Sequence, residues 1–245
     1  MQSLSFFALL AVNEYILNRG ERRMLTSRIE AYKRALELSG DGKAISKGSK
    51  LKDPFFSQLF DEQIKQHLHG VVFTGPSITP DFQLGLGKGR ELLSLHQFQH
   101  VITSFPALKF VIVDGCAHPV IVEVLLSQGI PAVIVTPPST HIKLVNSLGH
   151  RFAQQVGRKL SLESCWEQLK DELPHHPVWL EKNLRFQGAS KPLGTTTVEP
   201  GLYIPVSKEE QLAWKMGTPS AVMPANTRPL YAADWDAQAQ EGLGT

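Results

Sequence analysis

Apolar residues in the first two thirds of the chain follow two alternating patterns. Short continuous apolar runs, typical of strands buried on both faces, occur at 6–12, 71–74, 110–114 and 130–135. Apolar residues spaced three and four apart predict helices over 15–38, 54–69, 90–98, 120–128, 141–156 and 162–173. The polar segment 44–51 predicts a weak strand or a loop, and the glycine-rich segment 81–89 predicts a hairpin.

Glycine and proline separate these segments. The run Gly40-Asp41-Gly42 ends the first predicted helix, and Gly129 is a C-cap signal after the helix over 120–128. Strands and helices alternate as far as about residue 173. Such alternation predicts an α/β fold with a central, mostly parallel sheet and helices on both of its faces.

The composition and the periodicity of the sequence change beyond Pro174. Proline, glycine and threonine become frequent there, and the helical period fades. We therefore expect one domain over 1–173 and an irregular extension over 174–245 that packs on the domain or trails from it. The small, polar stretch 235–245 is typical of a frayed terminus or of a linker in a longer protein.

Composition and charge exclude several classes of protein. The net charge of +2 offers no electrostatic basis for binding nucleic acid or a membrane surface. No apolar run approaches the ~20 residues of a membrane-spanning helix. The segment 3–12 has the apolar character of a weak signal peptide, but it lacks a basic start and a small-residue cleavage site, so we interpret it as a buried strand.

The two cysteines, Cys116 and Cys165, are too few for a disulfide framework or a zinc site. We therefore expect a protein of the reducing cytoplasm that holds no metal. A glycine-rich stretch at 85–89 lacks the Gly-Lys-Ser/Thr ending and the strand–loop–helix setting of a phosphate loop, so we expect no nucleotide cofactor either. Cys165 lies beside Trp166 in a predicted helix, which favours a place in the core.

Cys116 is the residue in this chain that best fits a nucleophile. It comes directly after the apolar run 110–114 and just before a predicted helix. A helix N-terminus stabilises a thiolate, and backbone N–H groups at such a turn bind an oxyanion. From these residues alone a structural cysteine is the favoured interpretation, since cysteine is among the most buried residue types.

The segments around Cys116 resemble a known family. Residues 110–118 read FVIVDGCAH, and residues 122–136 read VEVLLSQGIPAVIVT. Together they resemble bacterial CHAT domains, which are relatives of caspases and separase, and the resemblance covers about 1–173 and, loosely, 198–216. It implies a caspase-like three-layer α/β sandwich in which Cys116 holds the position of the catalytic cysteine.

The chain departs from this family at the catalytic histidine. CHAT peptidases carry His-Gly at the end of the preceding core strand, where this chain reads FTGPS over 73–77. The resemblance places Pro76 at the histidine position, with Gly75 in the same loop. Proline has no group that accepts the thiol proton.

Two other sites offer a histidine. His118, two residues after Cys116, is a possible base, and it is also compatible with a partly exposed polar residue without a role. His69 precedes the run 71–74, so we expect it at the opposite end of the sheet.

Two functional hypotheses follow. The first is a degenerate CHAT peptidase that binds a protein or peptide partner and acts as a binding or regulatory module in bacterial defence or signalling. The resemblance implies that such a module is tethered to, or regulated by, a sensor domain or partner protein. The second is an active cysteine endopeptidase that uses Cys116 with a non-standard base. Whether the protein is an enzyme stays open on the sequence alone.

Overall fold

The structure is a computed structural model that describes residues 4–12, 17–46, 61–76, 84–85, 92–93, 100–115, 119–136, 148–171, 201–204 and 208–218. The strands are β1 (Ser5–Ala11), β2 (Gly42–Ser46), β3 (Leu68–Thr74), β4 (Leu84–Gly85), β5 (Leu92–Leu93), β6 (Phe110–Asp114), β7 (Ala132–Thr136) and β8 (Gly201–Tyr203). The helices are α1 (Arg19–Leu36), α3 (Glu62–His67), α5 (Pro119–Ser127), α6 (Leu148–Gly157), α7 (Leu162–Asp171) and the 3₁₀ helix η2 (Glu209–Ala213).

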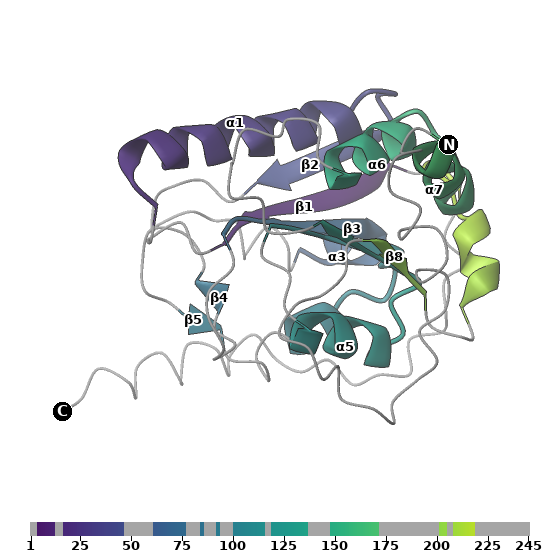
Figure 1. Cartoon of the computed structure of the whole chain (residues 1–245). Helices are drawn as coiled ribbons and strands as arrows, with labels where there is room; N and C mark the ends of the chain where they lie inside the picture. The colour runs from purple at the N-terminus through teal and green to yellow at the C-terminus, as the bar shows by residue number, and fades with distance from the viewer. Residues whose placement is uncertain are drawn as a thin grey trace.

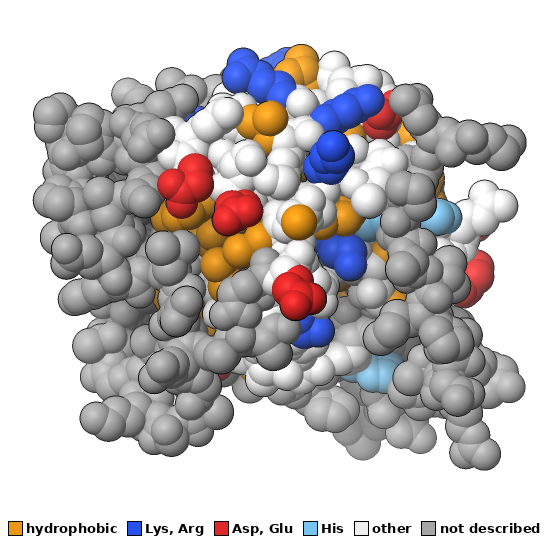
Figure 2. Space-filling view, turned by 90° about the vertical axis from the view of Figure 1, so that its right-hand side faces the viewer, with side chains coloured by type: hydrophobic (Ala, Val, Ile, Leu, Met, Phe, Trp, Pro, Cys, Tyr) orange, Lys and Arg blue, Asp and Glu red, His pale blue; other side chains and the backbone are white. Residues whose placement is uncertain are grey.

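The described strands form a six-stranded sheet in the order β2-β1-β3-β6-β7-β8. Its neighbours are parallel except for β7 and β8, which are antiparallel. This mixed, mostly parallel sheet confirms the α/β class. The amino-terminal ends of the parallel strands lie on the right in Figure 1, and Figure 2 looks onto that edge.

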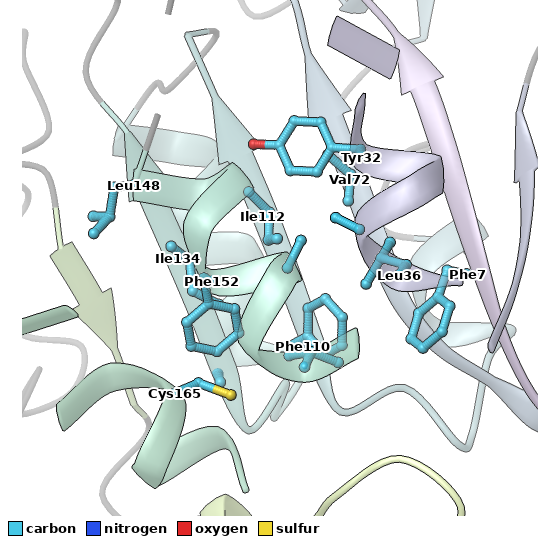
Figure 3. Close-up of a cluster of buried hydrophobic side chains, with 14 of the residues drawn as sticks. Phe7, Tyr32, Leu36, Val72, Phe110, Ile112, Ile134, Leu148, Phe152 and Cys165 are labelled. Atoms are coloured by element: carbon cyan, nitrogen blue, oxygen red, sulfur yellow. The ribbon is translucent and has the colours of Figure 1, made fainter. Parts of the chain in front are cut away.

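Side chains alternate between the two faces of the sheet, as the pleat of a strand requires. One face packs with α5, and the other packs with α1, α6 and α7 (Figure 1). Figure 3 shows the second cluster, in which the Phe110 ring lies between those of Phe7 and Phe152, with centroid distances of 5.9 Å and 6.0 Å. Because both faces are buried, a one-residue slip of a strand would exchange its two sets of apolar side chains, so the register is strongly specified.

Helix α1 begins four residues later than the pattern predicted, because a capping box sets its start. The Asn18 Oδ1 atom accepts the Glu21 backbone N–H at 3.0 Å, and the Glu21 carboxylate accepts the Asn18 N–H at 2.9 Å. These two bonds satisfy backbone donors that have no partner inside the helix. The helix is followed by Gly40, which has a left-handed φ of +79° at the predicted stop.

Two sequence predictions are wrong in their boundaries, and a third is wrong in the type of element. The helix expected to reach residue 69 ends at His67, and β3 begins at Leu68 rather than at Val71. The helix expected over 90–98 is also wrong, since Leu92–Leu93 is the strand β5 and pairs antiparallel with β4. In the third case a short apolar stretch, Leu92–Leu93, fits helix and strand periods equally well.

Part of the expected C-terminal extension belongs to the sheet. Strand β8 adds to the edge of β7, with Val133 opposite Tyr203 and Val135 opposite Gly201. The residues that follow return to the core, where Trp214 and Met216 are buried with α7. A three-residue strand shows no recognisable period, so the sequence pattern missed it.

Candidate functional site

The carboxyl ends of the central strands meet at one edge of the sheet. Ala11 of β1 lies opposite Thr74 of β3, Thr74 lies opposite Asp114 of β6, and Asp114 lies opposite Thr136 of β7. In open α/β sheets this edge is where ligands bind. The segments Gly75-Pro76 and Gly115 therefore leave neighbouring strands at the edge where a site is expected.

The backbone ladder continues past the last residues of these strands. The Gly75 N–H donates to the Asp114 carbonyl at 3.1 Å, and the Gly115 N–H donates to the Thr136 carbonyl at 3.4 Å. The Val12 N–H donates to the Thr74 carbonyl at 2.9 Å. These bonds hold the first residue of each loop in register with the next strand.

Both loops need glycine at their first position because the backbones approach closely. A Cβ atom on Gly75 would lie 2.0 Å from the carbonyl oxygen of Val12. A Cβ atom on Gly115 would lie 2.8 Å from the carbonyl oxygen of Gly75, and the φ of Gly115 is +82°. The loop after β3 and the loop after β6 are thus in direct backbone contact.

A buried carboxylate, that of Asp114, makes several polar contacts at this edge. Asp114 is 1% exposed, and its Oδ2 atom accepts the Tyr32 hydroxyl at 2.9 Å and the Thr74 hydroxyl at 3.4 Å. Its Oδ1 atom accepts the hydroxyl of Thr136. The Arg28 Nε atom lies 3.1 Å from Oδ2 and completes a buried ion pair. We call these five residues the Asp114 cluster.

The Asp114 cluster ties α1 to the ends of three strands. Isolated charges are very costly to bury, so a paired and hydrogen-bonded arrangement is the form in which Asp114 and Arg28 are tolerated inside the protein. The Arg28 Nη1 atom also lies 3.7 Å from where a Cβ atom on Gly115 would be. The guanidinium therefore lies close to Gly115, which immediately precedes Cys116 in the chain.

Helix α6 brings a histidine to the same edge. His150 lies in its first turn, is 5% exposed, and its ring meets the Tyr32 ring edge-on at 5.6 Å. Burial lowers the pKa of His150, against the opposing effects of a hydrogen bond to the Ala31 carbonyl and of the Asp114 charge. The imidazole is thus held mainly in its neutral form, which is the form that accepts a proton.

Of the residues expected at the site, Gly75 and Pro76 lie at the carboxyl edge, next to the turn at Gly115. Cys116 and His118 lie outside the described residues. His69 is inside β3 rather than before it, but it is at the opposite edge as expected. Five residue steps from His69 to Thr74 at ~3.3 Å each separate the two edges by about 17 Å.

The expectation for Cys165 is confirmed. Its side chain is buried in α7 among core residues, and burial raises the pKa of its thiol to about 12. A thiol of that kind stays protonated at neutral pH and is a poor nucleophile.

Sequence reasoning missed the partners of Asp114. Arg28 did carry a signal, because it lies three residues after Leu25 and four before Tyr32, inside the apolar stripe of α1. A charged residue in such a stripe needs a buried partner. His150 carried no comparable signal, because the pattern did not show which turn of its helix reaches the sheet edge.

Within the described residues, no group of three or more His, Cys, Asp or Glu side chains is placed to hold a metal ion. The same residues contain no helix with the length and apolarity that crossing a membrane requires. No protein-family model matches the chain, and no curated protein matches it.

Proposed function

We propose that this chain is a CHAT-type, caspase-like domain that has lost the catalytic histidine and serves as a binding or regulatory module. The module would recognise a protein or peptide partner in the cytoplasm, within a bacterial defence or signalling system. A sensor domain or partner protein would tether or regulate it.

One observation carries this proposal. Gly75 and Gly115 directly follow the neighbouring parallel strands β3 and β6, and their backbones are in contact. Positions 76 and 116 are the next residues in the chain after these two glycines. A base at position 76 would therefore be well placed to serve a nucleophile at position 116. Position 76 holds proline, which neither accepts the thiol proton nor protonates a leaving amine.

The test is the pH profile of alkylation of Cys116 by iodoacetamide, read by mass spectrometry with Cys165 as the buried internal control. We expect Cys116 to titrate as an ordinary thiol, near pH 8.5, because no base activates it. Pro76→His should shift this profile to lower pH by placing an imidazole in the loop, and Pro76→Ala should not. A wild-type Cys116 that reacts well below pH 8 would refute the loss of the catalytic base.

A second candidate, an active cysteine endopeptidase with a non-standard base, is favoured by the position of His150. Its imidazole belongs to the same edge, beside the Asp114 cluster, and is held mainly neutral. His118, two residues beyond Cys116, is the other candidate base. If Cys116 of the wild type reacts at low pH, His150→Gln and His118→Ala identify the base, because only removal of the true base returns the profile to pH 8.5.

A further inference from the structure

Helix α1 runs opposite to the parallel strands and extends past the carboxyl edge of the sheet. Its Arg28 pairs with Asp114, the last residue of β6. Near the other end of the helix, the Leu36 carbonyl oxygen would contact a Cβ atom on Gly42, the first residue of β2. The residues that precede Arg28 in the helix therefore lie beyond the ends of the strands, as the dark purple start of α1 shows in Figure 1.

Two exposed arginines lie on this extending part of the helix. At 1.5 Å per residue, Arg23 and Arg19 lie about 8 and 14 Å before Arg28 along the helix axis. They are four residues apart, so their side chains are neighbours on one face of the helix. That face points to the solvent, because both arginines are exposed while Arg28 and Tyr32, on the opposite side of the helix, are buried.

Neither arginine has an acidic partner in the described part of the chain. No ion pair there involves Arg19 or Arg23. Glu21 is engaged in the capping box, and Asp114 is neutralised within the Asp114 cluster. Glu30, an exposed acid of the same face, lies about 10 Å beyond Arg23 in the direction of the amino-terminal edge. Because a guanidinium group stays charged in proteins, the two arginines place uncompensated positive charge beside the candidate site.

The positions of these arginines do not serve the stability of the helix. The start of a helix carries partial positive charge and its end carries partial negative charge, so cations are favourable only near the end. Lys33 and Arg34 in the last turn follow this rule, whereas Arg19 and Arg23 oppose it. A local choice that opposes stability is expected where side chains take part in function.

We infer that Arg19 and Arg23 bind an acidic segment of the protein or peptide partner that the carboxyl edge recognises. The inference rests on the proposed function, since it names the chemistry of the partner of that module. A guanidinium group offers paired N–H donors that match the two oxygens of a carboxylate. A nucleic acid fits this face less well, because tight binding to phosphates takes many cations and the chain has a net charge of only +2.

The experiment measures the fluorescence anisotropy of a labelled peptide of alternating glutamate and glycine, titrated with the whole chain at low ionic strength. A matched peptide carries glutamine in place of glutamate. We expect saturable binding of the acidic peptide alone, which added salt weakens. Absence of binding, equal binding of the glutamine peptide, or tighter binding of a single-stranded oligothymidylate of the same charge would overturn the inference.

Two double variants with the same change in net charge locate the binding. Arg19→Gln with Arg23→Gln removes the proposed contacts, and Lys33→Gln with Arg34→Gln removes two charges from the other end of the same helix. From the strength of exposed ion pairs, we expect the first to weaken binding roughly two- to thirtyfold and the second less than about twofold. The first should also unfold at an unchanged or higher urea concentration, because it removes cations from the start of a helix. Equal weakening by both would reduce the effect to net charge and refute the inference.

A nitroxide label on the acidic peptide shows where it binds. We expect paramagnetic broadening of the backbone N–H signals of Gly75 and Gly115, while that of Lys109, at the opposite edge, stays sharp. No broadening at the two glycines would place the peptide elsewhere and contradict the inference. Failure here is distinct from failure of the proposed function, which is contradicted by a wild-type Cys116 that reacts well below pH 8, whatever the acidic peptide does.

Discussion

Replacing Arg28 by methionine tests whether the Asp114 cluster holds the candidate site together. The variant keeps the apolar stem of the side chain but leaves the buried Asp114 carboxylate without its cation, which now lies 3.1 Å away. Removing one partner of a buried ion pair costs roughly 3–5 kcal/mol. Because hydroxyl groups of Tyr32, Thr74 and Thr136 still donate to the carboxylate, we expect the lower end, about 3 kcal/mol.

The assay is urea unfolding followed by circular dichroism, with Arg23→Met as the control on an exposed position of the same helix. The control should change the free energy of unfolding by less than about 0.5 kcal/mol. Asp114→Asn, combined with Arg28→Met, should cost less than the sum of the two single variants, since the pair is removed together. A loss below about 1 kcal/mol for Arg28→Met, or strict additivity in the double variant, would refute the cluster as a coupled unit.

Three further predictions concern other buried groups. Gly149→Ala should destabilise the fold by about 1–3 kcal/mol in thermal or urea unfolding, because the new methyl group would lie 2.5 Å from Ile112 and 2.6 Å from the Tyr32 hydroxyl; a gain of stability would contradict this packing. His69 has a pKa of about 4 in the folded protein against 6.5 when unfolded, so the unfolded state binds more protons between these values. Stability should therefore rise from pH 4 to 6.5, by up to about 3 kcal/mol at 1.4 kcal/mol per pKa unit, and His69→Phe should flatten that part of the profile. Cys165 should resist iodoacetamide at pH 8 in native protein and react on unfolding in urea, since its thiol pKa is raised to about 12; ready native labelling would contradict its burial.

The central strands were predictable because they are buried on both faces. The run Phe110–Asp114 forms β6 with the expected bounds. Four consecutive apolar residues followed by Asp114 are typical of a strand that is buried on both faces. The start of β3 was not predictable in the same way. His69 and Gly70 are small or polar and looked like the end of a helix, yet tertiary packing buries both of them completely or nearly so.

The sheet edge at which we propose the site was predictable from the sequence, but the side chains that support this edge were not. Strand ends at Gly75 and Gly115 follow from the apolar runs and from the rule that parallel strands share their carboxyl edge. The Tyr32 hydroxyl and Asp114, by contrast, are 82 residues apart in the chain and meet only after the sheet has formed. No local pattern encodes such a pair, although Arg28 inside an apolar stripe signalled that a buried partner exists.

At the carboxyl edge, groups of the protein itself meet the Asp114 charge, whether or not a reaction takes place there. The two glycines at 75 and 115 are required by backbone contact and would be needed in a peptidase and in a binding module alike. Stability and fold therefore carry no information on catalysis here. A peptidase and a binding module would differ in whether a proton acceptor is available to position 116. Position 76, in the loop that follows the neighbouring strand, holds a proline, which accepts no proton.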